Sequence, residues 1–133
     1  MNPYNNTRVQ RTLAPAARTA TANGTTVDRA ASGARYQDAL VVIDTGVVTD
    51  GTHTFTVQES ANGTSWSAVA DADLQGTEPV VTSANDDTVY ELGYVGGARY
   101  LRVAVTVAGA TNGGIYSAAV VLSNARRGPA DRS

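Results

Sequence analysis

Short segments of alternating apolar and polar residues recur along this chain, separated by Gly, Asn or Asp. In the clearest of them, RYLRVAVTVA, the residues Leu101, Val103, Val105 and Val107 share one face. A two-residue period is that of a half-buried β-strand, and tight turns favour Gly, Asn and Asp. The pattern predicts strands at 38–48, 53–59, 66–70, 78–83, 88–95, 99–108 and 115–123.

This spacing decides the fold class. About eight short strands with turns between them predict an all-β fold, a single antiparallel β-sandwich or jelly-roll-like domain. The length of 133 residues suits one such domain. The only short helical candidate, TLAPAARTA, is interrupted by Pro15. The segment 38–48 is almost continuously apolar, so we expect a central strand buried on both faces.

Charge divides the chain into three parts. Residues 1–27 carry three arginines and no acidic residue, whereas residues 28–123 carry four arginines and eleven acidic residues. The last ten residues are basic again. Since the first residues also lack periodicity, we expect an extended basic N-terminal arm over 1–22, a β-sandwich body over 23–123 and a basic C-terminal tail over 124–133.

The residue types that carry chemistry are scarce. The chain has no cysteine, no lysine and one histidine, His53. Composition therefore excludes disulfides, thiolate metal sites and a phosphate loop that requires lysine. His53 follows a turn and has no histidine partner, so we expect a half-exposed residue at the end of a strand. The stretch DADLQG begins like a calcium loop, but Gln75 stands where that loop has Asp or Asn, and Thr82 where it needs a bidentate Glu. We predict no enzyme activity, no cofactor and no metal.

Two classes of partner are also disfavoured. No apolar run approaches the ~18 residues of a membrane span, and no apolar segment of a secretory signal is visible. The acidic body argues against nucleic-acid binding, which needs a basic face. We expect neither a membrane nor a nucleic-acid partner.

The only tryptophan, Trp66, follows the polar stretch QESANGTS. In one interpretation the Asn-Gly pair at 62–63 forms a hairpin turn, and the strand that begins at Trp66 pairs with 53–59. The indole would then cover Phe55 or Val57 at the margin of the core.

The alternative interpretation is a ligand platform. In that case Trp66 would act together with Tyr94 or Tyr100 on an exposed face, as aromatic residues do in carbohydrate-binding sandwiches. Trp66 and its neighbours then predict a carbohydrate- or host-surface-binding module.

A longer series of motifs resembles a family of tailed-phage virion proteins. It runs from ALVVIDTGVVTDGTHTFTVQESANGTSWSAVADADLQG through VYELGYVGGARYLRVAVTVAG to GGIYSAAVVLSNAR, and it covers roughly residues 24–126. The GARYLRV segment is the most specific part of it. The chain is similar to head decoration (cement) proteins or minor capsid proteins of phages that have an HK97-type shell.

This resemblance implies a structural role on the outer capsid surface of the virion. The implied partners are the major capsid protein and other copies of this chain, as a trimer or another small homo-oligomer. The basic arm would dock on the capsid through Tyr4, Arg8, Arg11 and Arg18, since arginine pairs well with carboxylates. Another virion component, such as a neck, tail or head-fibre-base protein, remains an alternative of the same class.

Overall fold

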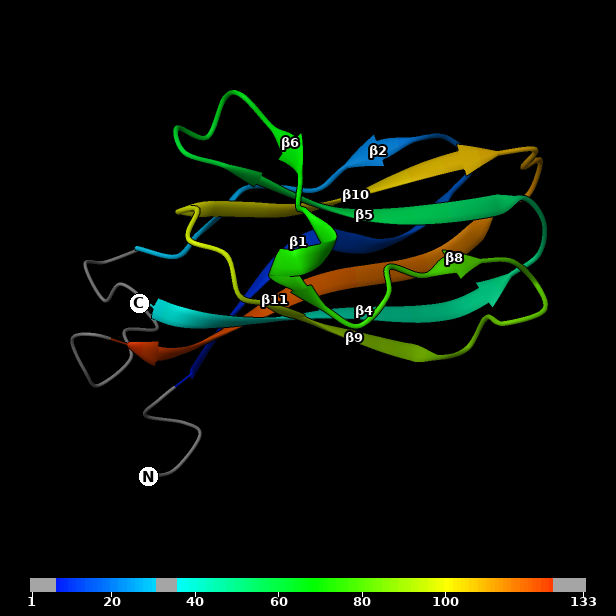
Figure 1. Ribbon diagram of the computed structural model, residues 1–133. Helices are drawn as coiled ribbons and strands as arrows, with labels where there is room; N and C mark the ends of the chain where they lie inside the picture. Colours follow the sequence, from blue (N-terminus) through cyan, green and yellow to red (C-terminus); the bar gives the residue numbers. More distant parts are fainter. Residues whose placement is uncertain (1–6, 31–35, 126–133) are drawn as a thin grey trace.

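Two antiparallel sheets pack face to face in a β-sandwich, as predicted (Figure 1). The computed structural model describes residues 7–30 and 36–125. In this part of the chain no α-helix occurs, and no helix is long and apolar enough to cross a membrane. The strands are β1 (Thr7–Arg18), β2 (Ala22–Asn23), β3 (Val27–Asp28), β4 (Tyr36–Val48), β5 (Thr52–Ser60), β6 (Ser67–Ala68), β7 (Leu74–Gln75), β8 (Val80–Val81), β9 (Val89–Tyr94), β10 (Tyr100–Ala108) and β11 (Gly114–Ala125).

The five-stranded sheet has the order β1-β11-β4-β9-β7. Its long central strands, β11 and β4, pair over almost their whole length, with Val120 opposite Val41. The six-stranded sheet has β2, β10, β5 and β6 in that order, with β3 paired to β10 and β8 paired to β5. There β10 and β5 pair in register, with Val103 opposite Val57.

The core lies between the sheets, and the two-residue alternation supplies it from both sides. In β10 the predicted apolar face is buried, while Arg102 and Thr106 point outward. In β9 Leu92 and Tyr94 are buried and Val89 and Glu91 are exposed. The buried apolar residues include Leu13, Val27, Val41, Ile43, Phe55, Val57, Leu92, Leu101, Val103, Val105, Tyr116, Val120 and Leu122.

The predicted N-terminal arm is wrong from residue 7 onward, because residues 7–18 form the edge strand β1. This strand pairs with β11 and inserts Leu13 into the core at 2 % exposure. The strand contains few large apolar residues and no regular alternation, so the sequence pattern did not predict it. Pro15 falls within a register shift between Leu13 and Ala16, where the missing N–H disturbs no regular ladder.

A threonine ties β1 to the six-stranded sheet as well. The hydroxyl of Thr12 donates to the carbonyl of Thr25 at 2.8 Å and accepts from the amide of Val103 at 3.1 Å. The body of the sandwich therefore includes residues 7–22, which the prediction assigned to the arm. At the other end β11 continues to Ala125, and residues 126–133 of the predicted tail lie outside the described residues.

The prediction that 38–48 is buried on both faces is also wrong. This stretch lies in β4, which is central in its sheet, but its burial alternates. Asp38, Asp44 and Val47 are exposed on the outer face, and no element of the described chain covers that face. Of the outer apolar residues of β4, Val47 is exposed, and Leu40 and Val42 are half-buried.

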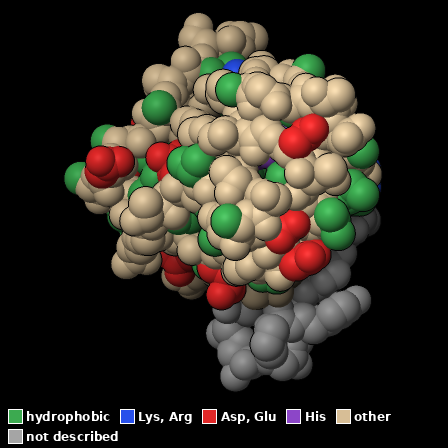
Figure 2. Space-filling view, turned by 90° about the vertical axis from the view of Figure 1, so that its right-hand side faces the viewer, with side chains coloured by type: hydrophobic (Ala, Val, Ile, Leu, Met, Phe, Trp, Pro, Cys, Tyr) green, Lys and Arg blue, Asp and Glu red, His purple; other side chains and the backbone are tan. Residues whose placement is uncertain are grey.

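The end of the sandwich that carries the β4–β5 and β10–β11 turns is acidic. Figure 2 views this end and shows acidic side chains spread across it, with few basic ones. Asp50 belongs to the β4–β5 turn, and Asp86 and Asp87 lie in the loop before β9. The opposite end, where β10 begins, carries Arg29 and Arg99. Arg99 is paired there with Asp28, and Glu59 and Asp38 lie at the same end, so this end carries charges of both signs.

Candidate functional site

Four side chains form a surface on the outer face of the six-stranded sheet, near the start of β10. They come from the segment just before β6 and from the first residues of β10, which the β5–β6 turn brings together. We call them the aromatic–arginine surface: Trp66, Arg99, Tyr100 and Arg102.

Trp66 and Arg102 form the first pair of this surface. The guanidinium carbon lies 4.4 Å from the centroid of the indole, a cation–π geometry. Arg102 Nε donates to Gln58 Oε1 at 2.6 Å, which holds the guanidinium in place. Burial lowers the pKa of Arg102 below its ordinary value. No described residue bonds to the two terminal nitrogens, so they can donate to a ligand.

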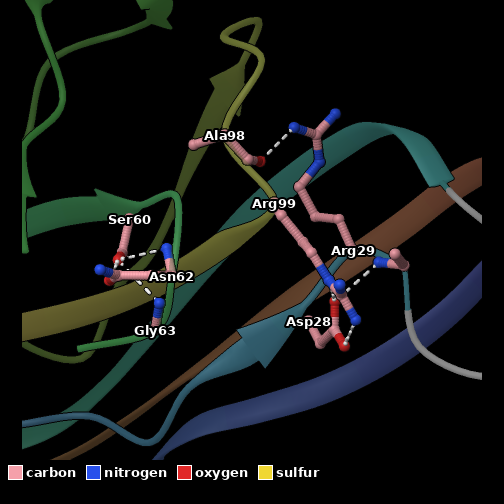
Figure 3. A network of polar contacts seen from close by, with 8 residues as sticks. Asp28, Arg29, Ser60, Asn62, Gly63, Ala98 and Arg99 are labelled. Carbon is pink, nitrogen blue, oxygen red and sulfur yellow. Dashed lines mark hydrogen bonds and ion pairs between the residues drawn. The ribbon is translucent and has the colours of Figure 1, made fainter. Parts of the chain in front are cut away.

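Tyr100 and Arg99 form the second pair. The guanidinium carbon of Arg99 lies 5.0 Å from the centroid of the phenol ring. Its Nε and Nη2 donate to the two carboxylate oxygens of Asp28 at 2.8 and 2.9 Å (Figure 3). The hydrogen bond from Arg99 lowers the pKa of Asp28, and the same contact raises the pKa of Arg99.

The turn between β5 and β6 positions Trp66. Ser60 Oγ accepts from the amides of Asn62 and Gly63 at 3.2 and 2.9 Å (Figure 3). Asn62 Oδ1 accepts from the amides of Thr64 and Ser65. Gly63 has a φ of +79°, so the predicted turn at 62–63 is confirmed. The predicted pairing of the return strand is confirmed too, with Ser67 opposite Glu59.

The predicted place of the indole is wrong. Trp66 does not cover Phe55 or Val57, which point into the core. It is half-buried on the opposite face of the sheet, where it lies over Arg102. The reason is the register, since Ser67 opposes the inward-facing Glu59 and its neighbour therefore faces outward.

The three aromatic residues of the predicted platform do not all meet. Trp66 and Tyr100 share the outer face, but Tyr94 is a core residue with 2 % exposure. Its hydroxyl donates to Glu59 Oε1 at 2.7 Å and accepts from the amide of Ala98 at 2.9 Å. Burial, followed by the contact with Glu59, raises the pKa of Tyr94 to about 12.

The sequence did not predict a role for Arg29. Its side chain lies beside Tyr94 and binds backbone carbonyls at this end of the sandwich. The residue is 9 % exposed, and its guanidinium lies 5.2 Å from the ring centroid of Tyr94. It donates to the carbonyls of Ala98 and Gln37 at 2.6 and 2.8 Å (Figure 3 shows the Ala98 contact). A cavity of about 490 Å³ adjoins it. Arg29 follows the two-residue strand β3, which is too short to show the alternation that predicts a buried position.

The three arginines predicted to lie on the arm are in β1, and they differ in exposure. Arg11 is exposed on the outer face of the five-stranded sheet. Arg8 is half-buried, and the guanidinium of Arg18 lies 5.9 Å from the ring of Tyr116. Tyr4 lies outside the described residues. Of these three arginines, Arg11 alone is exposed.

The prediction that His53 is half-exposed is wrong. The imidazole is fully buried between the sheets. Its Nε2 lies 3.1 Å from the carbonyl of Asp50 and its Nδ1 lies 2.8 Å from the hydroxyl of Tyr116. A carbonyl can only accept, so Nε2 carries a proton, and in the neutral imidazole Nδ1 then accepts from the hydroxyl. Burial raises the pKa of Tyr116 to about 12.

The acidic residues of DADLQG form a short 3-10 helix, η2 (Asp71–Asp73), at the surface. Within residues 7–30 and 36–125, no three acidic or histidine side chains converge as metal ligands would. No protein family matches the chain, and no curated protein sequence matches it.

Proposed function

We propose that this protein is a structural component of a tailed-phage virion, which decorates the outer capsid surface by binding the major capsid protein. The motif series over residues 24–126 supports the virion assignment by resemblance. The aromatic–arginine surface supports the binding role. It offers two stacked pairs, each fixed by a second contact before any partner arrives.

The chemistry of this surface suits a protein partner that carries carboxylates. Trp, Tyr and Arg are the residues that contribute most to the free energy of binding at protein interfaces. Arg102, stacked on Trp66, keeps both terminal nitrogens without a described partner, and these match a carboxylate geometrically. Arg99 already pairs with Asp28. Because the pairs are preformed, binding costs less side-chain entropy.

Decoration of capsids that lack this protein tests the proposal. We expect Trp66→Ala and Arg102→Ala each to weaken binding at least ~10-fold, the effect of losing an interface residue worth more than ~1.4 kcal/mol. Thr111→Ala, in an exposed turn at the acidic end, is the matched control and should bind like the wild type. Sedimentation measures how much of each variant is bound to the capsids. Normal binding of both variants would contradict the proposal.

A second candidate function is carbohydrate binding, which the shared face of Trp66 and Tyr100 favours. Exposed aromatic rings on one sheet face stack on sugars. A glycan array with the wild type and Trp66→Ala separates this candidate from the first. Binding to a glycan that Trp66→Ala abolishes would support it, and an empty array would exclude it from the tested sugars.

A further inference from the structure

The outer face of the five-stranded sheet is an exposed apolar surface. Four of its large apolar side chains are more than half exposed: Val9 at 64 %, Val47 at 56 %, Val89 at 57 % and Ile115 at 51 %. Between them lie the half-buried residues Leu40, Val42 and Val121. Asp44 and Ser117 interrupt these apolar residues between Val42 and Val47. Large exposed apolar patches mark protein interaction sites in soluble proteins. We call this surface the outer apolar face.

The strand register places opposite charges at the two ends of one row of this face, while Asp38 and Asp44 lie on the interior strand β4. One row of side chains crosses the sheet as Arg11, Ala119, Val42 and Glu91, on β1, β11, β4 and β9. Arg11 and Glu91 are both exposed, and neither forms an ion pair with another described residue. The row therefore has a cation at one edge, a carboxylate at the other and small or branched apolar residues between them.

We propose that a second copy of this chain covers the outer apolar face, in a two-fold dimer whose axis runs along the strands between β11 and β4. This rotation carries β1 of one copy over β9 of the other and keeps each row at its own height. Arg11 then meets Glu91 of the second copy, and the reverse pair forms at the opposite edge. A two-fold contact is self-complementary, as this arrangement requires.

Charge disfavours an axis that runs across the strands at the height of this row. Such an axis would place Arg11 against Arg11 and Glu91 against Glu91, which is repulsive. With the axis along the strands, Val42 lies over Ala119 of the second copy. Asp44 lies over Ser117 of the second copy, so this acid meets a hydroxyl and not a like charge.

The size of the face is adequate for a stable dimer. Three strands of 12 to 13 residues, together with β9, cover this side of the sheet. At ~3.3 Å per residue and ~4.8 Å between strands, the face measures roughly 700 Å² in projection. Stable interfaces bury about 800 Å² per partner. Two sheets packed at ~10 Å leave a gap that Arg and Glu side chains can span.

Reciprocal charge reversal tests the dimer. Sedimentation equilibrium of the full chain at ~1 to 200 μM should show a monomer–dimer equilibrium for the wild type. We expect Arg11→Glu or Glu91→Arg alone to raise the dissociation constant at least ~10-fold, because each creates two like-charge contacts. The double variant restores both pairs in reversed order and should return to within ~3-fold of the wild type.

Two controls separate this inference from the proposed function. Asp71→Arg makes the same charge change as Glu91→Arg but lies in η2, outside the strands that form the face, so it should leave the dissociation constant unchanged. Trp66→Ala alters the other sheet and should also leave it unchanged. A wild type that is monomeric over the whole range, a trimer, or a double variant weaker than either single variant would overturn the dimer.

Discussion

At the residue scale, the most informative side chains are polar groups that the fold has buried. His53 and Tyr116 come from opposite sheets and meet in the core, with their rings edge to face at 5.2 Å between centroids. The histidine reads in sequence as the end of a strand, since a turn precedes it. Its inward position follows from the alternation of β5, in which it shares a face with Phe55 and Val57.

Removing one partner of the His53–Tyr116 pair should lower the free energy of unfolding. Tyr116→Phe leaves the buried Nδ1 of His53 without its donor, so we expect a loss of ~1–3 kcal/mol in the free energy of unfolding. Tyr90→Phe is the matched control, because the Tyr90 hydroxyl donates to Asn85 at an exposed site. Urea denaturation measures the free energy of unfolding of both variants. Equal losses would show that burial of the His53–Tyr116 hydrogen bond adds nothing to stability.

The ion pair of Asp28 and Arg99 predicts a pH dependence of stability. The hydrogen bond from Arg99 lowers the pKa of Asp28 in the folded chain. A folded pKa below that of the unfolded chain, ~3.9, gives stabilisation that is complete above about pH 4. It is lost as the pH falls through the folded pKa.

Melting temperatures between pH 7 and pH 2 measure this effect. We expect Asp28→Asn to melt below the wild type at pH 7, and the gap to close under acid. Asp71→Asn changes an exposed carboxylate that makes no hydrogen bond with another described residue, and should follow the wild type. A gap between Asp28→Asn and the wild type that stayed constant down to pH 2 would contradict the assignment.

At the element scale, β1 changes the meaning of the basic N-terminal segment. A deletion of residues 1–20 would remove the whole of this strand and expose the edge of β11, so it would test folding and not capsid docking. Leu13→Ala should lose ~2–5 kcal/mol of unfolding free energy, as buried leucines do. Ala14→Ser, at an exposed position of the same strand, should stay within ~0.5 kcal/mol. Chemical denaturation distinguishes a core strand from a loosely attached arm.

The β10–β11 turn offers a matched pair of glycines. Gly109 and Gly113 have φ of +68° and +75°, respectively. A side chain at Gly109 meets open space, whereas one at Gly113 collides with the carbonyl of Arg18. We expect Gly109→Ala to lose about 1 kcal/mol from the left-handed backbone alone, and Gly113→Ala to lose clearly more. Equal losses of unfolding free energy in urea denaturation would show that the Arg18 carbonyl of β1 does not restrict position 113.

At the scale of the whole molecule, the two sheets share one core, so the described chain should unfold as a unit. Val41 and Val103 are fully buried and come from different sheets. Val41→Ala and Val103→Ala should each lose about 2 kcal/mol from lost burial and the cavity left behind. Calorimetry at a fixed protein concentration should show a single transition that shifts in both variants. Two transitions that respond separately would contradict a common core.

The molecule also separates its surfaces by chemistry. One sheet carries the aromatic–arginine surface and the other carries the outer apolar face, while the turns at one end are acidic (Figure 2). In the proposed arrangement, the outer apolar faces meet in a dimer and each copy keeps its aromatic–arginine surface free. A dimer would then present that surface twice, which strengthens attachment to a repeating shell.

The sequence by itself determined the β-sandwich class, the positions of the long strands after residue 36, and the turn at 62–63. These follow from local physics, because strand alternation and the backbone freedom of Gly act over a few residues. The edge strand β1 was beyond reach, since its stability comes from β11 and from Thr12, over ninety residues from Val103 in sequence. Only the tertiary structure decided which aromatic residues share a face, because register assigned Trp66 and Tyr100 to the outside and Tyr94 to the core. It also decided that β4 has one open side, since whether a second layer covers an apolar strand depends on the packing of the whole chain.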